Sequence, residues 1–241
     1  MGGGRSQWEV VLDGINDMIT TGRLTPGSRL PVEKDLAEQL GVSRGSLREG
    51  VRALALMGVL ETRQGDGTYV TALDPATLLA PLGVLVNLQH PGNVVDVMVV
   101  RRTLEVEAAG RAASRITDDE LAAAGDILTE MEAMLSQPTV EHDAVMEADV
   151  SFHRVIAQAS GNPTLSAMIN GMASRTVRAR MWRALHEEGV ERLTHVEHQA
   201  ILAALAARDP DAARLRMGVH LLSVEQYLAS HLDVDSGWAT G

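Results

Sequence analysis

The signals for β-structure in this 241-residue chain are confined to one short stretch, and this confinement limits the folds that it can adopt. β-Branched and aromatic residues at positions 59–62 and 68–71 flank an Asp66-Gly67 turn, which predicts a β-hairpin. After Asp74-Pro75, apolar residues recur only at helical spacing, almost to the end of the chain. We therefore expect a mainly α protein, with a small N-terminal unit that contains the hairpin and an all-helical bundle behind it.

Three helices are expected before the hairpin. Apolar residues at helical spacing predict the first between Trp8 and Gly22, and the second is a short helix that Gly41 closes. Ser43 is a favourable N-cap for the third helix, from Arg44 to Met57. Three helices followed by a hairpin are typical of a winged helix-turn-helix, in which the helix after the turn enters the major groove of DNA.

Seven further helices are expected in the second part of the chain, and proline or glycine marks four of the breaks between them, at 90–92, 137–138, 161–163 and 209–210. Their predicted ranges are 75–89, 93–114, 118–135, 140–160, 163–185, 189–207 and 210–231. We expect a disordered leader at 1–7, a winged helix-turn-helix domain at 8–73, an all-helical domain of six or seven helices at 74–232, and a loose tail at 233–241.

The composition excludes several classes of site and protein. The chain has no cysteine, which excludes disulfides, thiolate metal sites and cysteine nucleophiles, so any bound metal must use His, Asp or Glu. The longest apolar runs, such as Val94–Val100, contain a charged residue and fall far short of the roughly 20 residues of a membrane span. We expect a cytoplasmic protein with no membrane partner.

The formal net charge of −11 is unevenly distributed. Residues 1–72 carry 8 Lys and Arg against 9 Asp and Glu, a net of −1, which leaves 13 against 23, a net of −10, for residues 73–241. A nearly neutral N-terminal unit binds phosphates when its cations share one face. The acidic remainder argues against a structural nucleoid protein, because such proteins need broad positive charge.

A stripe of arginines marks the predicted third helix. Arg44, Arg48 and Arg52 are four residues apart and therefore lie on one face. Arginine forks suit phosphate oxygens and guanine edges alike, and Ser43 and Ser46 add hydrogen-bonding groups near the same end of the helix. An isolated stripe of this kind is more often a solvated face, but its place in a helix-turn-helix favours DNA contact.

The N-terminal motifs resemble those of one family. They are Pro26-Gly27-Ser28-Arg29-Leu30-Pro31, Glu33-Lys34-Asp35-Leu36-Ala37, Gly41-Val42-Ser43-Arg44, Leu47-Arg48-Glu49, and Gly65 and Gly67 with Val70. Together they resemble the DNA-binding domain of GntR-superfamily transcription regulators. The helical remainder resembles the FadR subgroup, whose FCD domain binds effectors and forms dimers.

This resemblance implies a bacterial regulator, expected to be a repressor and not an enzyme, that binds operator DNA as a homodimer and responds to a small carboxylate such as an organic or sugar acid. By resemblance, Lys34, Arg44, Arg48 and Gly67 contact the operator. Gly67 at the hairpin tip lets the backbone approach the minor groove. Lys34 replaces the more usual arginine, so a phosphate contact rather than a bidentate one is expected there.

Four residues of the second domain form a candidate metal site. Asp149 and His153 are four apart on one predicted helix. His198 lies 12 residues before Pro210 and His220 lies 10 after it, so a helix hairpin at Pro210 brings these two level. Spacing alone leaves open that the histidines are surface or core residues. All four positions match the ligand motifs of metal-containing FCD domains, which implies a bound Zn²⁺, with Ni²⁺ or Mn²⁺ as alternatives.

Two alternatives stay open. The segment from Arg101 to Glu105 resembles the family's Arg-x-x-Leu-Glu motif, whose arginine points to the effector pocket, so Arg101 is expected to bind the effector carboxylate. Its alternative role is an ion pair between helices. The alternative function is a metal-dependent hydrolase, because an open Asp/His site can activate water. Glu141 and Glu147 are near in sequence, but no pattern places either as the partner base.

Overall fold

The computed structural model describes residues 6–88 and 93–231. Two predicted segments fall outside the described residues: the tail at 233–241 and the first five residues of the leader. The chain divides into two compact units, Met1–Leu78 and Leu79–Gly241. The sequence placed this boundary between residues 73 and 74, ahead of a short helix that falls in the first unit.

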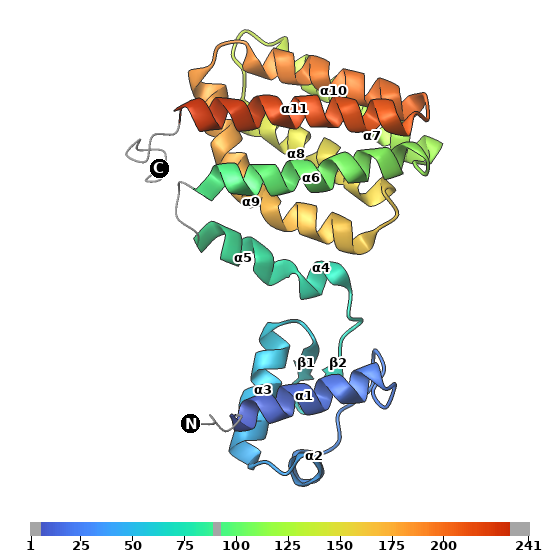
Figure 1. Ribbon diagram of the computed structural model, residues 1–241, viewed down its shortest axis with the longest axis vertical. Helices are drawn as coiled ribbons and strands as arrows, with labels where there is room; N and C mark the ends of the chain where they lie inside the picture. The colour runs from blue at the N-terminus through green and yellow to red at the C-terminus, as the bar shows by residue number, and fades with distance from the viewer. Residues whose placement is uncertain (1–5, 89–92, 232–241) are drawn as a thin grey trace. The chain divides into compact units, whose positions relative to one another are not determined.

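Within the described residues, the N-terminal unit contains three helices, a two-stranded sheet and a final single-turn helix (Figure 1). The elements are α1 (Gln7–Thr20), α2 (Glu33–Leu40), α3 (Arg44–Leu56), β1 (Leu60–Arg63), β2 (Gly67–Val70) and the single turn α4 (Pro75–Leu78). The strands pair antiparallel from Leu60 opposite Val70 to Arg63 opposite Gly67. This arrangement confirms the predicted winged helix-turn-helix.

The first helix starts earlier than the sequence predicted. Its N-cap is Ser6, and the Glu9 carboxylate accepts a hydrogen bond from the Ser6 backbone N–H at 2.9 Å. An acidic group at this position also offsets the positive end of the helix dipole. Residues 6 and 7 therefore belong to the helix and its cap, and the expectation of a disordered leader is wrong for these two positions.

The core of the N-terminal unit lies where α1 crosses α3. Its fully buried residues include Val11, Ile15, Leu36, Leu47, Leu60 and Val70. Gly50 of α3 is placed at the crossing, and a Cβ atom built on it would lie 2.5 Å from Val11 Cγ1 and 2.6 Å from Val11 Cβ. The turn between α2 and α3 uses Gly41, whose φ of 68° is the left-handed conformation that ends a helix. These two glycines set the angle at which α3 is presented.

Seven helices form the second unit within the described residues. They are α5 (Ala80–Leu88), α6 (Val94–Ala113), α7 (Asp118–Leu135), α8 (His142–Ala159), α9 (Pro163–His186), α10 (Val190–Ala206) and α11 (Pro210–His231). The predicted helix 75–89 is broken at Leu79 into α4 and α5, so that prediction is wrong in detail. The predicted all-helical second domain is confirmed.

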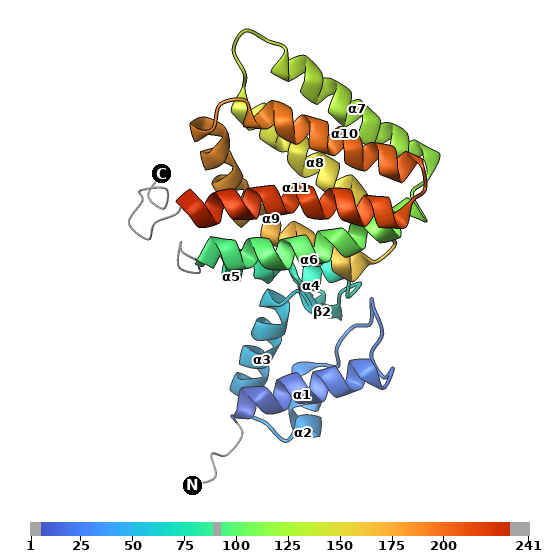
Figure 2. The same ribbon diagram turned by 45° about the horizontal axis from the view of Figure 1, so that its top comes forward.

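The long helices of the second unit surround α8. Helix α6 packs along α11, and the two lie side by side in Figures 1 and 2. Helix α8 packs against α6, α7 and α9, and α10 packs against α7 and α11. Phe152 of α8 is completely buried, and its ring lies 4.8 Å from the ring of His198. None of the described helices combines the length and apolar character that crossing a bilayer requires.

The close approach of α1 and α3 predicts opposite effects at two glycines of α3. Gly50→Ala should lower the free energy of unfolding by about 1–3 kcal/mol, because the new methyl group overlaps the buried Val11 and the two helices must move apart. Gly45→Ala meets only Ser43 Oγ at 3.7 Å and should stabilise the helix by up to about 1 kcal/mol. Urea unfolding followed by circular dichroism compares them, and equal effects would contradict this packing.

Candidate metal centre and DNA-binding face

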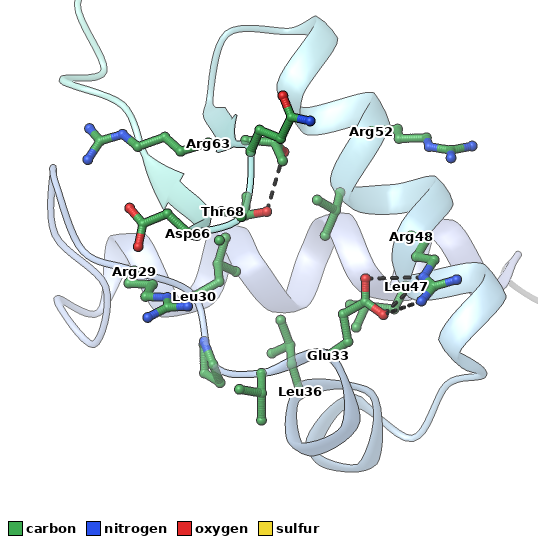
Figure 3. Close-up of a pocket in the computed structure, with 17 residues that line it drawn as sticks. Arg29, Leu30, Glu33, Leu36, Leu47, Arg48, Arg52, Arg63, Asp66 and Thr68 are labelled. Carbon is green, nitrogen blue, oxygen red and sulfur yellow. Dashed lines mark hydrogen bonds and ion pairs between the residues drawn. The ribbon is translucent and has the colours of Figure 1, made fainter.

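A groove of about 640 Å³ lies between the helix-turn-helix and the hairpin of the N-terminal unit (Figure 3). Arg48 and Arg52 of α3 line it on one side, and Arg63 and Gly67 of the hairpin line it on the other. Of the six residues predicted to contact DNA, Arg48 and Gly67 therefore share this groove. The other four predicted contacts lie on α2 and at the start of α3; they are Lys34, Ser43, Arg44 and Ser46.

The start of α3 is held by its own serines. Ser43 Oγ accepts a hydrogen bond from the Ser46 backbone N–H at 3.1 Å, and the two hydroxyl oxygens are 2.9 Å apart. Ser43 and Arg44 are exposed, and Ser46 is half-buried. The Ser43 hydroxyl thus has a capping role that is independent of any DNA contact.

Arg48 is paired with Glu33, the first residue of α2. Its Nε donates to both Glu33 carboxylate oxygens, at 3.1 and 2.9 Å, and its Nη2 lies 2.8 Å from one of them. The hydrogen bond from Arg48 lowers the pKa of the Glu33 carboxyl below its usual value. Sequence analysis missed this partner, because residues 15 apart on different helices show no periodic relation.

Two further cations lie at the hairpin and were not predicted as DNA contacts: Arg63 belongs to β1, and Arg29 precedes α2 and bridges to Tyr69 of β2. Gly67 has a φ of 139°, and a Cβ atom there would lie 2.7 Å from Arg29 Nε, so glycine at this position lets the Arg29 side chain lie against the hairpin. The guanidinium of Arg63 lies 4.2 Å from the centre of the Tyr69 ring. The Tyr69 hydroxyl donates to Asp66 at 2.8 Å. These contacts order the hairpin tip.

The second unit brings together the four predicted metal ligands, Asp149, His153, His198 and His220. All are buried, and one ligand atom of each lies within 4.8 Å of the corresponding atoms of the other three. His198 Nε2 is 3.5 Å and His153 Nε2 is 3.9 Å from Asp149 Oδ1, and the Nε2 atoms of His153 and His220 are 3.3 Å apart. Three helices, α8, α10 and α11, contribute to the cluster.

Neighbouring carboxylates orient two of the imidazoles. His153 Nδ1 pairs with Glu105, and His220 Nδ1 lies 2.8 Å from Glu197 Oε2. When each Nδ1–H donates to its carboxylate, each Nε2 presents a lone pair to the cluster, which is the usual arrangement around a bound metal. Within the described residues, neither ring nitrogen of His198 has a hydrogen-bond partner.

Burial favours the neutral form of two of the imidazoles, His198 and His220. Desolvation, reinforced by the neighbouring histidines, holds the pKa values of His198 and His220 well below their usual value of 6.5. A neutral imidazole is the form that binds a metal. Burial also raises the pKa of Glu197 to about 7, although the charge of Arg183 opposes this shift.

Three buried arginines surround the cluster. Arg101 pairs with Glu105 on the same helix, α6, and its Nη1 lies 3.3 Å from Thr176 Oγ1. This pair differs from the ion pair between helices that the sequence left open as its alternative role. Arg180 pairs with Asp149 Oδ2. Arg183 Nε donates to Glu187 at 2.7 Å. No sequence motif indicated a role for Arg180, which lies on α9.

A small cavity of about 40 Å³ adjoins the cluster. Its polar wall includes Asp149, Arg180, Arg183 and His220, and its apolar wall includes Met131, Val145, Met146, Val190 and Val224. Arg180 also lines a second cavity of about 10 Å³, together with Arg101, Glu105 and His153. Burial lowers the pKa of the Arg180 guanidinium well below its usual value.

Three further titratable residues near the cluster in sequence are not part of it. His195 is buried one turn before His198, but its Nε2 is 3.0 Å from a Glu132 carboxylate oxygen and it does not belong to the four-residue cluster. Glu141 and Glu147, the two acids considered from the sequence as a partner base, are exposed and line neither cavity. The described site therefore offers no carboxylate from these two positions as a hydrolytic base.

Comparison with known proteins identifies both units. The family "Bacterial regulatory proteins, gntR family" matches residues 8–70, and the "FCD domain" family matches residues 96–223. The chain is 33% identical to the HTH-type transcriptional regulator LutR of Bacillus subtilis, over 90% of this chain and 98% of that protein. It is 34% identical to the putative L-lactate dehydrogenase operon regulatory protein of Escherichia coli, over 88% and 82% of the two chains.

A solved structure has the same arrangement of elements. The Streptococcus agalactiae GntR structure aligns with a TM-score of 0.64 and 28% identity, over 91% of this chain and 99% of that chain. The Escherichia coli McbR/YncC structure aligns with a TM-score of 0.52 at 20% identity, which supports the fold alone.

The adjacent arginines of α6 predict a large difference in stability. Arg101→Met should lower the free energy of unfolding by about 3–5 kcal/mol, because it leaves the Glu105 carboxylate buried without its cation. Arg102→Met removes only the partly exposed pair with Glu225, 2.9 Å apart, and should cost under about 1 kcal/mol. Urea unfolding of both variants measures the difference. Similar losses would show that Arg101 is not needed to hold Glu105.

Proposed function

Because the chain belongs to the GntR family of bacterial transcription regulators and carries an FCD domain, we propose that it is a repressor of the FadR subgroup whose operator affinity is controlled by a small carboxylate beside a bound metal. It is a transcription regulator and not an enzyme, so the hydrolase alternative is set aside. We further propose that it binds DNA as a homodimer, with α3 in the major groove and the wing at the minor groove.

The observation that carries this proposal is the buried Asp149, His153, His198 and His220 cluster. Buried polar atoms are normally hydrogen-bonded, yet both nitrogens of His198 lack such a partner among the described residues. Two of the other imidazoles have their Nδ1 atoms beside carboxylates. A metal ion would satisfy the Nε2 atoms and the Asp149 oxygen together, which supports its presence.

The donor set favours a transition metal over calcium or magnesium. Three imidazoles and one carboxylate suit Zn²⁺, Ni²⁺ or Mn²⁺, and we propose Zn²⁺ as the first candidate. When bound, the ion would supply positive charge and a coordination position for an anion. Asp149 would then have two roles, because its Oδ1 faces the histidines while its Oδ2 pairs with Arg180.

The cavity beside the cluster supports a short carboxylate as the effector. Arg180 and Arg183 offer two cations, Asp149 and Glu191 add carboxylates, and methionine and valine side chains form much of the remaining lining. A cavity of 40 Å³ has room for only a few water molecules, which disfavours a long acyl chain. One relative is named for an L-lactate dehydrogenase operon, so L-lactate is the first acid to test. Arg101 stays a predicted effector contact, but Arg180 lines this cavity and Arg101 does not, so Arg180 is the stronger candidate.

The size of the cavity also suggests how binding would reach the DNA-binding domain. Helices α7, α8, α9, α10 and α11 all contribute to its walls. Even a three-carbon acid is larger than the present space, so its entry requires these helices to move apart. We propose that this movement shifts the population of dimer arrangements that fit two operator half-sites.

Metal content separates ligands from a neighbouring buried histidine. The full chain, purified without an affinity tag, should contain about one transition metal per molecule by elemental mass spectrometry. His198→Ala should lose most of this metal, because it removes one of four ligands. His195→Ala, also buried but outside the cluster, should keep it. Equal metal in both variants, or none in the parent protein after incubation with Zn²⁺, would contradict the site.

Effector coupling is tested on an operator selected by the protein from random duplexes. Saturating L-lactate should change the operator Kd by about five-fold or more, which is the usual scale of allosteric coupling. Arg180→Met should abolish this response without abolishing DNA binding, whereas Arg178→Met, an exposed arginine on the same helix, should respond normally. An Arg180→Met protein that responds like the parent would remove Arg180 from the effector site, and a parent that responds to no short acid would contradict the coupling.

A further inference from the structure

The contact between Glu33 and Arg48 joins the two helices of the DNA-reading motif. Glu33 is the first residue of α2, and Arg48 lies one turn into α3. The two side chains are in direct contact at one side of the groove, and the hairpin lines the other side (Figure 3). Both are more than half exposed, so the pair itself contributes little to stability. The main effect of the pair is therefore to fix the orientation of the Arg48 guanidinium.

Glu33 occupies one edge of the Arg48 guanidinium and leaves another edge available. The carboxylate contacts Nε and Nη2, at 2.8 to 3.1 Å. Guanidinium is planar, and its Nη1 and Nη2 atoms carry a second pair of parallel N–H groups at the far end of the fork. Among the described contacts of Arg48, none uses Nη1. Two parallel N–H groups match the O6 and N7 acceptors of guanine.

We propose that Glu33 is a specificity-determining residue that holds the Arg48 fork toward a guanine edge in the major groove. This inference rests on the proposed operator binding. Without Glu33, the arginine side chain can rotate and contact phosphates, which carry no sequence information. With it, the plane and direction of the guanidinium are fixed before DNA arrives, which lowers the entropy lost on base recognition.

The location of Glu33 argues for this role. An acidic side chain on a DNA-facing groove repels phosphates and therefore lowers affinity for every sequence. The same groove is lined by Arg52 and Arg63, which favour phosphates. Asp35 also places a negative charge in the first turn of α2. The described contacts of Arg48 include none with Asp35. Asp35 is therefore a matched control.

The test compares base discrimination by full-length Glu33→Gln, Asp35→Asn and Arg48→Ala. Each protein is titrated with the duplex that the parent selects from a random library, and with duplexes in which one guanine at a time is replaced by adenine. Glu33→Gln should lose about ten-fold discrimination at one guanine, and Arg48→Ala should lose it at the same guanine. Asp35→Asn should keep the preference of the parent. Glu33→Gln and Asp35→Asn each remove a negative charge, so both should bind unrelated duplexes more tightly than the parent does.

The outcomes separate this inference from the proposed function. A selective parent with a Glu33→Gln variant that is equally selective overturns the positioning role alone. Loss of discrimination by Asp35→Asn to the same extent also overturns it, because general charge would then explain the effect. A parent that selects no sequence overturns the proposed operator binding, and this inference falls with it.

Discussion

Four polar side chains meet at the centre of the helical bundle, and the polar contacts around them follow from the need to satisfy all four away from water. An unpaired polar or charged group in a protein interior is strongly destabilising. Glu105 and Glu197 therefore face the outer nitrogens of two imidazoles, Arg101 balances Glu105, and Arg180 balances Asp149. The inner nitrogens are left facing one another, and a metal ion is the proposed partner that all of them share.

The same rule of paired charges operates at the DNA-reading end, under different conditions. There the side chains are exposed, so an ion pair contributes little to folding stability, and its main effect is to fix the orientation of the arginine side chain. Glu33 fixes Arg48, while Gly67 gives the Arg29 side chain its place beside the wing. In the bundle, pairing makes burial tolerable, and on the surface it orients a cation toward a ligand. The proposed regulator thus uses one type of interaction for two purposes.

Local patterns were enough to predict most of the fold, because helical spacing, the Asp66-Gly67 turn and the break at Pro210 correspond to observed elements. The four cluster residues were identified by their resemblance to FCD ligand motifs, since spacing alone left other roles open for the histidines. Contacts between distant segments were not predictable in this way. Arg180 and Glu33 each meet a partner on another helix, and neither position carries a periodic signal. The break at Leu79 was also missed, because the apolar residues on both sides continue a helical pattern.

An X-ray absorption spectrum of the metal in the full-length protein shows whether the four buried residues hold an ion. If they do, we expect nitrogen and oxygen neighbours at about 2.0–2.2 Å, with outer-shell scattering from about three imidazole rings. A first shell of oxygen atoms without imidazole scattering would contradict the site, because the ion would then be bound by carboxylates or water away from His153, His198 and His220.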